Sequence, residues 1–409
     1  MQISNPDKFY DLVVVGAGMV GASFCCALEN LLGENPISVL VIEAIPPGND
    51  LAKQSSFDAR STALSFGSRK ILEEFAVWQE LGAAVCAIDE IQVSDRGRLG
   101  AVSLSAQEQK VDALGYVVEN KRLGEVLNAR LLGSDTINLL SPAAVSSIKA
   151  TEGGMQLRLQ HGDSDAIVDT SLVVLADGGK SPVCEQLGIS QSIERYDQHA
   201  LIANIVFEKP HNNIAYERFT DTGPLAILPL QAIGGMNRGS LVWTLSVEQA
   251  AEFREMNEEQ LLSLLQERFG FKLGKITNIG ERFVYPLSLS LAKEQVRPGL
   301  ALLGNVAHTL HPVAGQGLNL ALRDARVLVD VLGKAMQQGV TLGDMSMLLE
   351  YVARQEADQA LTTQFTHNIT KLFSSNNDAK VWLRKFGLLA IELSPRIRHG
   401  LAERAMGLS

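Results

Sequence analysis

Two short apolar runs near the start of the chain flank a glycine-rich turn and a helix-like stretch. Residues 10–15 read Tyr-Asp-Leu-Val-Val-Val, and residues 37–42 read Ile-Ser-Val-Leu-Val-Ile. Continuous β-branched runs of this length are typical of strands that are buried on both faces of a parallel sheet. A helix-like stretch follows the glycine-rich turn of residues 16–21 and extends to about residue 32. The pattern therefore predicts a βαβ unit over residues 10–43.

Two kinds of pattern interleave further along the chain. Short strand-like runs dominate residues 137–176, whereas longer runs over 199–247 predict a mainly antiparallel sheet. Helical patterns lie between and after these runs, over residues 62–75, 121–132, 248–268 and 342–409. The sequence has no internal repeats and no low-complexity linkers. We therefore expect two structural parts that are not divided by a single clean boundary.

Composition and charge exclude several classes of protein. The chain has 409 residues, of which 46% are apolar and 20% charged, so it can bury a large core without disulfides or a structural metal. Its 36 basic and 46 acidic residues give a net charge of −10, which argues against a nucleic-acid binder. No uninterrupted apolar run approaches the ~18–20 residues that a membrane-spanning helix requires.

The cysteines carry no recognisable metal or redox motif. Cys25, Cys26, Cys86 and Cys184 show neither C-x-x-C spacing nor a Cys/His ligand pattern, so we expect buried structural thiols. The first ten residues lack the basic and then apolar layout of a secretion signal. Both observations favour a cytoplasmic, reducing location.

The strongest local motif lies between the two strands of the predicted βαβ unit. Gly16, Gly18 and Gly21 form a G-x-G-x-x-G pattern, and Glu43 ends the second strand. In this context the glycines permit a tight turn, close approach to a pyrophosphate and close packing of helix on strand. An acid at the position of Glu43 accepts hydrogen bonds from ribose hydroxyls. The motif predicts a dinucleotide site, and because it occurs once, it favours FAD with a nicotinamide nucleotide that binds transiently elsewhere.

Two further segments follow buried strands. Asp177 and Gly178 come directly after the run 171–176, where an ordinary Asp-Gly turn is the alternative interpretation. The segment 304–319 contains glycines at 315 and 317 just before a helix, whose N-terminus can face an anion or an electron-rich ring. His308 and His311 are three residues apart, but no third ligand has suitable spacing, so we expect no metal site.

The order and content of these motifs resemble a known family. Together with Asp58-x-Arg60, Glu217-Arg218-Phe219-Thr220 and Tyr285-Pro286-Leu287, they are similar to class A flavin-dependent aromatic hydroxylases of the para-hydroxybenzoate hydroxylase fold. Within that family they most resemble the ubiquinone-biosynthesis hydroxylases, including those that act on 2-polyprenyl-6-methoxyphenol. The resemblance extends from about residue 10 to residue 400.

The resemblance implies a particular architecture. It is an α/β fold in which an FAD-binding Rossmann-like (GR2-type) domain is interleaved with a mainly antiparallel β-sheet substrate domain and a C-terminal helical segment. The FAD-binding domain would comprise residues 1–75, 116–185 and 285–370, and the substrate domain residues 76–115 and 186–284. Residues 371–409 would form the C-terminal helical segment.

The resemblance also implies roles for individual residues. Gly16, Gly18 and Gly21 would hold the FAD pyrophosphate, Glu43 the adenosine ribose and Asn305 the ribityl chain. Arg60 would lie near the cofactor, and Asp177 with Gly178 would serve both FAD and NADH or NADPH. The residues expected to line the isoalloxazine ring are Pro312, Gly315, Gly317, Leu318 and Asn319.

Two positions depart from the family pattern, and the catalytic residues stay open. Asn305 replaces the usual Asp, although its amide can still bind a ribityl hydroxyl. Cys184 stands where the second motif usually ends in Arg. This departure puts in doubt how the pyridine nucleotide is bound and whether NADH or NADPH is preferred. No general base is evident from the sequence, and the flavin-adjacent candidates are His311, Pro312 and Gly315.

The implied reaction is the FAD-dependent, NAD(P)H- and O₂-consuming hydroxylation of a polyprenylated phenol in ubiquinone biosynthesis, through a C4a-hydroperoxyflavin. The alternatives are a related hydroxylase acting at another ring position or on a soluble aromatic, and a non-catalytic FAD-binding subunit of a biosynthetic complex. We expect a homo-oligomer, with other ubiquinone-biosynthesis proteins as candidate partners. Residues 381–391 suggest peripheral contact with a membrane or partner, or simply an amphipathic helix packed on the body.

Overall fold

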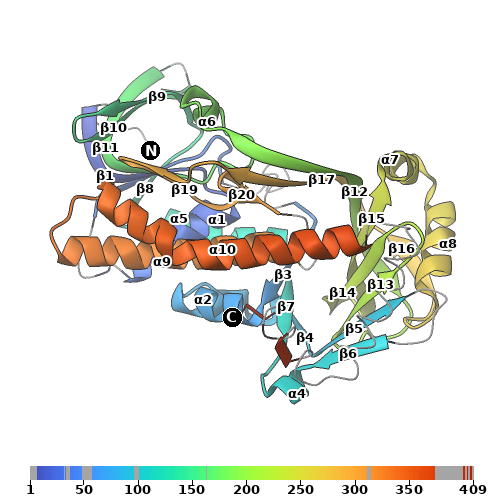
Figure 1. Cartoon of the computed structure of the whole chain (residues 1–409). Coiled ribbons are helices and arrows are strands. Elements are labelled where there is room, and N and C mark those ends of the chain that lie inside the picture. Colours follow the sequence, from blue (N-terminus) through green and yellow to red (C-terminus); the bar gives the residue numbers. More distant parts are fainter. Residues whose placement is uncertain are drawn as a thin grey trace.

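The structure is a computed structural model that describes residues 7–31, 33, 37–47, 58–95, 101–162, 164–310, 315–373, 399–400, 403 and 406–407. These residues form an eight-stranded first sheet, a nine-stranded second sheet and a three-stranded small sheet. Figure 1 shows the first and second sheets at opposite ends of the molecule, with the helices α9 (Gln316–Gln337) and α10 (Met345–Phe373) running side by side.

The first sheet has a parallel centre. Its parallel strands are, in spatial order, β8 (Ile137–Leu140), β2 (Val39–Ile42), β1 (Asp7–Val15), β11 (Ser164–Leu175) and β19 (Leu300–Leu302). Three antiparallel strands extend it, namely β18 (Val296–Arg297) beside β19, then β10 (Gly154–His161) beside β11, and β9 (Ala144–Thr151) beside β10. The strand order places the chain's first βαβ unit at the centre of the sheet.

The continuous apolar run of β1 is explained by burial on both of its faces. Leu12 and Val14 pack in a core with the helices α1 (Met19–Leu31), α5 (Asn120–Gly133) and α9. Val13 and Val15 point to the opposite face, into a core with β9, β10 and the short helix α6 (Pro182–Gln186). The βαβ unit predicted over residues 10–43 is thus confirmed.

The small sheet corrects one predicted helix. Residues expected to begin a helix at 62 instead form β3 (Ser61–Ser65), which is antiparallel to β7 (Gly115–Glu119). The helix α2 (Phe66–Glu74) begins only after Ser65, whose hydroxyl accepts the backbone N–H of Ser68. This cap fixes the start of the helix. The remaining elements of this region are β4 (Cys86–Ile88), α3 (Trp78–Leu81), η2 (Gly82–Ala84) and α4 (Ala106–Gln109).

The second sheet is mainly antiparallel, as the pattern over residues 199–247 predicts. Among its described strands, only β13 and β5 pair in parallel. Its strands are, in spatial order, β20 (His308–Thr309), β17 (Phe283–Ala292), β12 (Gln191–Phe207), β15 (Met236–Ser246), β14 (Pro224–Ile233), β13 (Ile214–Phe219), β5 (Glu90–Asp95) and β6 (Ala101–Ser105), with β16 (Ile276–Ile279) beside β12.

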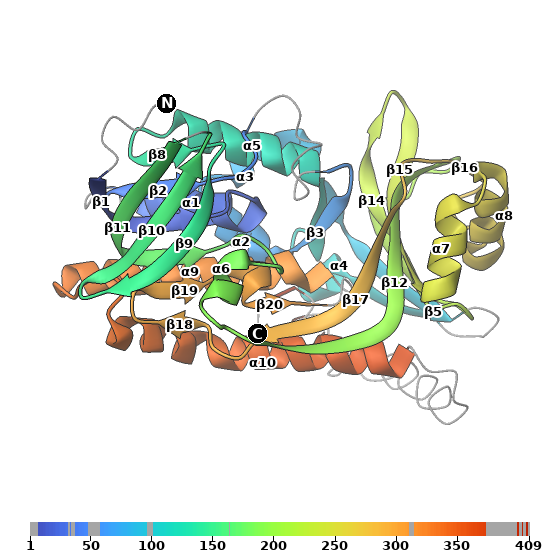
Figure 2. The same cartoon turned by 90° about the horizontal axis from the view of Figure 1, so that it is seen from above.

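The two faces of the second sheet have different neighbours. On the outer face, Leu201, Leu225 and Trp243 are completely buried beneath α7 (Val247–Glu255) and α8 (Glu258–Phe269). Figure 2 shows these helices on the side of the second sheet that is turned away from the first sheet. The inner face is turned toward the small sheet, and there Asn204 Nδ2 donates to the backbone oxygen of Ala59 at 3.0 Å.

The long strands β12 and β17 join the two parts of the molecule. They pair from Gln191 opposite Ala292 to Ile202 opposite Phe283 and run from beside the first sheet into the second (Figures 1 and 2). The expected ranges assign residues 285–370 to the FAD-binding domain, whereas β17 and β20 pair into the second sheet. Most of residues 371–409, including 381–391, lies outside the described residues.

Two further expectations concern the cysteines and membrane spans. Cys25, Cys26, Cys86 and Cys184 are all buried and free, as predicted, and burial raises the pKa of Cys26 and of Cys86 to about 11. Within the part of the chain that the structure describes, no helix is both long and apolar enough to cross a membrane.

Candidate active site

In the glycine-rich turn between β1 and α1, two positions have no room for a side chain. Gly16 has a φ of +99°, and a Cβ there would lie 2.7 Å from the backbone oxygen of Ala176. A Cβ at Gly21 would lie 2.0 Å from the backbone oxygen of Gly16. Gly18 directly precedes α1, whose first N–H groups lack partners within the helix. The turn therefore brings backbone donors and the positive end of a helix dipole to one place.

Glu43 lies beside this turn at the end of β2. One oxygen of its carboxylate accepts the N–H of Ala17 at 2.6 Å, and the other accepts the N–H of Ile45 at 2.9 Å. A carboxylate has about four acceptor positions, so these bonds orient Glu43 and leave acceptor capacity for ribose hydroxyls.

Asp177 carries an unused acceptor. One carboxylate oxygen accepts the hydroxyl of Ser181 at 2.7 Å, whereas the other, Oδ1, is buried and has no hydrogen-bond partner among the described residues. Burial raises the pKa of this carboxyl above its usual value. The adjacent Gly178 has a φ of +94°, and a Cβ there would meet no atom within 4 Å. A buried acceptor beside open space is what a ligand hydroxyl would complete.

The third motif meets the first two. In the short helix η3 (Gly304–Val306), a Cβ at Gly304 would lie 3.0 Å from the side chain of Val20 in α1. Asn305 is exposed, and its backbone oxygen accepts the hydroxyl of Thr309 at 3.0 Å. A Cβ at Gly179 would lie 3.0 Å from that same hydroxyl oxygen. The three motifs, separated by more than a hundred residues each, therefore converge.

The N-terminus of α9 is built around Gly315 and Asn319. Gly315 has a φ of +60° and packs against Ala63 of β3. The buried amide of Asn319 accepts the N–H of Ser65 at 2.8 Å and donates to the backbone oxygens of Ala63 at 3.0 Å and Gly315 at 2.7 Å. This amide is therefore committed to positioning the loop, whereas a Cβ at Gly317 would meet nothing within 4 Å and its surroundings are open.

The other predicted positions vary in what the structure shows. Leu318 is half-buried against the core that contains α9. His311 and Pro312 lie outside the described residues. Cys184 is buried in the core behind α6, and its N–H donates to the hydroxyl of Ser181. The side chain of Cys184 therefore packs behind the segment that carries Asp177 and Gly178.

Arg60, which directly precedes β3, links the small sheet to the inner face of the second sheet. Its guanidinium pairs with Asp58 at 2.7 Å and stacks over the ring of Tyr285, 4.5 Å from the ring centroid. Both contacts hold the Arg60 side chain between β3 and β17.

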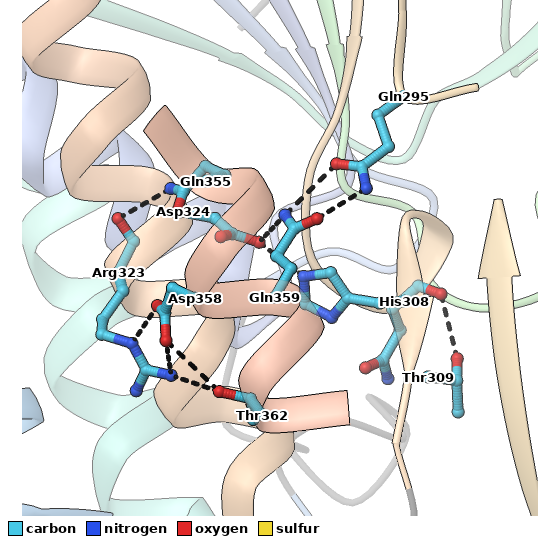
Figure 3. Close-up of polar contacts among 10 residues, drawn as sticks. Gln295, His308, Thr309, Arg323, Asp324, Gln355, Asp358, Gln359 and Thr362 are labelled. Carbon is cyan, nitrogen blue, oxygen red and sulfur yellow. Dashed lines mark hydrogen bonds and ion pairs between the residues drawn. The ribbon is translucent and has the colours of Figure 1, made fainter. Parts of the chain in front are cut away.

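Sequence reasoning did not find a buried polar cluster behind the third motif. Asp324 of α9 is completely buried and accepts from Nε2 of His308 at 2.5 Å and from Gln359 of α10 at 3.2 Å. Gln359 in turn pairs with Gln295, as Figure 3 shows. His308 is thus committed to Asp324, and no group of three His, Cys, Asp or Glu side chains in the described ranges could hold a metal ion. The available signal was a carboxylate on the apolar face of α9.

These observations fit a bound dinucleotide with a ring system. The chain offers helix N-termini for a pyrophosphate, acceptors at Glu43 and Asp177 for hydroxyls, and open space at Gly178 and Gly317. Hydroxyl donors of such a ligand would satisfy the two carboxylates.

Comparison with known proteins agrees with this reading of the geometry. The model of the family described as FAD binding domain matches residues 10–366. A relative from Rhodospirillum rubrum, "Ubiquinone hydroxylase UbiL", is 34% identical over 98% of this chain and 91% of its own length. "3-demethoxyubiquinol 3-hydroxylase" of Escherichia coli is 31% identical over 97% of this chain and 98% of its own length.

A solved structure shows the same fold. It is p-nitrophenol 4-monooxygenase PnpA from Pseudomonas putida, with a TM-score of 0.78 and 16% identity, covering 97% of this chain and 98% of that one. The chain therefore belongs to the FAD-binding-domain family, and it is an FAD-dependent aromatic-ring monooxygenase related to ubiquinone hydroxylases.

Proposed function

We propose that the protein hydroxylates the ring of a polyprenylated phenol, 2-polyprenyl-6-methoxyphenol, in ubiquinone biosynthesis, with NADH or NADPH as electron donor. The observation that carries the proposal is the full-length similarity, at 31% and 34% identity, to two relatives whose names describe ubiquinone-type ring hydroxylation. The inner face of the second sheet supports it, because Ile202, Phe283, Tyr285 and Leu287 form an apolar cluster beside Arg60.

Each part of the chain contributes to this reaction in a definite way. When bound, FAD supplies the activation of O₂ with electrons from NAD(P)H. The glycine turn at Gly16–Gly21 would bind its pyrophosphate, Glu43 and Asp177 would accept its hydroxyls, and Asn305 would reach its ribityl chain. Asn319 holds the N-terminus of α9 against β3, so that the helix N–H groups stay oriented toward the ring.

The inner face has two tasks in this proposal. Its apolar side chains would bind the substrate ring and the start of the lipid tail, and they would exclude water from the reacting oxygen. The outer face is closed by α7 and α8, so the inner face is the side of the second sheet on which an apolar substrate can approach the cofactor.

The test is turnover of a defined probe. Purified protein is reconstituted with FAD and mixed with 2-methoxyphenol carrying a short prenyl chain, NADH or NADPH, and oxygen. We expect flavin absorbance in the purified protein, reduction by the nucleotide, and a product that is one oxygen atom heavier. Protein that binds no flavin, or that oxidises the nucleotide without forming this product, would contradict the proposal.

A second candidate is hydroxylation at another ring position. The Escherichia coli relative, whose name describes 3-hydroxylation of 3-demethoxyubiquinol, is nearly as similar as the Rhodospirillum rubrum relative. Quinone intermediates in a deletion strain distinguish the two cases. Accumulation of 2-polyprenyl-6-methoxyphenol supports the main proposal, whereas accumulation of a 3-demethoxyubiquinone-type compound supports the second.

A further inference from the structure

Glu217 is a carboxyl group on the inner face of the second sheet. On β13 the side chains alternate, and Tyr216 packs on the outer face with its ring centroid 5.5 Å from that of Phe269 in α8. Ala215 packs on the opposite side, in a core with Leu228 and Leu230 of β14. Because side chains two residues apart share a face, Glu217 lies on the inner face with Ala215.

The strand register places Glu217 in a row of apolar side chains. Glu217 is opposite Val93 on one side and Ala226 on the other, and the row continues through three more strands. Its members are Val93, Glu217, Ala226, Val242, Ile202 and Phe283, which we call the inner row. Glu217 is the one charged side chain in the inner row.

The inner row is accessible, in contrast to the outer face. Every member of the inner row except Ile202 keeps partial solvent exposure. The outer-face residues next to it in sequence, Leu225, Leu241 and Trp243, are completely buried. An apolar strip that retains accessible surface within a folded protein is suited to cover a ligand.

The carboxyl of Glu217 has no partner. Among the described residues, no hydrogen bond or ion pair reaches it, although surrounding protein raises its pKa to about 7 through desolvation. Other charged groups on this face are paired, Arg60 with Asp58 and Arg238 with Glu119, each at 2.7 Å. The remaining inner-face acid on the neighbouring strand is Asp95, opposite Phe219. An unpaired carboxyl in apolar surroundings costs free energy, and a ligand that supplies a hydrogen-bond donor would offset this cost. Such a carboxyl is therefore a candidate for a functional site.

The inner row also lies on the cofactor side of the sheet. Tyr285, two residues along β17 from Phe283, stacks with Arg60, which directly precedes β3. Ala63 of β3 in turn contacts Gly315 at the N-terminus of α9. Two contacts, joined by short steps along β17 and into β3, therefore connect this face to the position expected for the isoalloxazine ring.

We propose that Glu217 binds the phenolic hydroxyl of the substrate and accepts its proton. The O–H bond of the phenol breaks, an O–H bond forms on the carboxylate of Glu217, and the electron pair stays on the phenolate oxygen, which enriches the ring for attack by oxygen. After the transfer the proton returns to the product oxygen. This inference rests on the proposed function, because it assumes a phenolic substrate.

The arrangement suits this proton transfer for two reasons. The transfer moves one negative charge from carboxylate to phenolate, so the apolar site never has to bury a second charge. A carboxyl whose pKa is about 7 is also closer to that of a phenol, ~10 by analogy with Tyr, than an ordinary Glu would be, which makes it a better base.

The experiment uses FAD-reconstituted wild type, Glu217→Gln, Glu217→Asp and the matched control Glu90→Gln. Glu90 lies on the adjacent strand β5 but points to the outer face, where it accepts from Gln92 and Ser103. With the prenylated 2-methoxyphenol probe, we expect kcat/KM of wild type to rise with pH through about 7. Glu217→Gln should lose this limb and be slower by about 10²-fold or more, whereas Glu217→Asp should retain the limb.

A second readout needs binding only. Wild type and Glu90→Gln should bind the probe more tightly than its O-methyl ether, because only the free hydroxyl can donate to a carboxylate. In Glu217→Gln this preference should be clearly smaller. Flavin absorbance and circular dichroism confirm that each variant is folded. An unchanged preference and an unchanged pH limb in Glu217→Gln would overturn the assignment of Glu217. Failure of wild type to hydroxylate a probe that it binds in preference to the ether would instead contradict the proposed function.

Discussion

Asp324 and Glu217 are both carboxyl groups in apolar surroundings, and the molecule treats them in opposite ways. Asp324 is completely buried between α9 and α10 and accepts hydrogen bonds from His308 and Gln359. Glu217 lies on a partly accessible sheet face and has no hydrogen-bond partner among the described residues. The difference is one of degree, because Oδ1 of Asp324 and Nδ1 of His308 also have no hydrogen-bond partner among the described residues. Two donors hold the other oxygen of Asp324, whereas no donor from the described residues holds the carboxyl of Glu217.

Location explains the difference. The His308–Asp324–Gln359 cluster lies behind the loop that carries Asn305 and ties that loop to two helices (Figure 3). Any uncompensated charge there would destabilise the protein in every state. Oδ1 of Asp177 is a buried acceptor without a partner among the described residues, on the side where the cofactor is expected. The carboxyl of Glu217 lies on the partly accessible face where the substrate is expected. Four stability measurements test this contrast.

The largest effect is expected for Asp324→Ala. The substitution leaves His308 and Gln359 without their shared acceptor and creates a cavity, so we expect the free energy of unfolding to fall by about 3–5 kcal/mol. Urea denaturation followed by circular dichroism measures it. A loss below about 1 kcal/mol would show that the cluster does not support the fold.

Glu217→Gln should have the opposite sign, and only at high pH. The folded-state pKa of about 7 exceeds the ordinary value of 4.5, so between these values the folded protein holds a proton that the unfolded chain has released. Wild-type stability therefore falls as pH rises from about 4.5 to about 7. Relative to wild type, the variant should be more stable by up to about 3 kcal/mol at pH 8 and nearly equal near pH 4.5. Thermal unfolding across this range measures the difference, and a pH-independent difference would refute the elevated pKa.

Gln359→Ala should have an intermediate effect. It removes one of the two donors to Asp324 and the paired amide contact with Gln295, but the bond from His308 remains. We expect a loss of about 1–2 kcal/mol. Combined with Asp324→Ala, the loss should be clearly less than the sum of the two single losses, since the substitutions share one interaction. Additive losses would mean that the two side chains act independently.

Glu90→Gln is the smallest change and serves as the reference for Glu217. Its carboxylate already has polar neighbours on the outer face, so we expect a change within about 0.5 kcal/mol and no new dependence on pH. The same thermal unfolding series measures it. A pH-dependent gain like that expected for Glu217→Gln would show that the effect belongs to any carboxyl on this sheet.

Sequence alone predicted the features that depend on neighbouring residues. The βαβ unit follows from two apolar runs and three glycines within 34 residues, and the antiparallel character of residues 199–247 follows from their strand pattern. The start of α2 was misplaced because the cap at Ser65, together with the pairing of β3 to β7, overrides the local helical pattern.

The candidate site was only partly predictable for the same reason. The three motifs could be recognised one by one, but their convergence and the use of Asn319 as a clamp depend on contacts across more than 250 residues. Glu217 was visible only as part of a family motif. Its isolation in an apolar row follows from the pairing of strands that lie between residues 90 and 292, which no local pattern reveals.

The long pairing of β12 with β17 has a consequence for how the protein must be handled. Each of these two strands starts beside one sheet and ends in the other. Neither part of the molecule therefore contains the whole of this strand pairing. A cut between the parts would strip these strands of their partners and expose unpaired backbone, which templates aggregation. We therefore expect the two parts to fold as one unit, so that neither is stable when it is expressed alone.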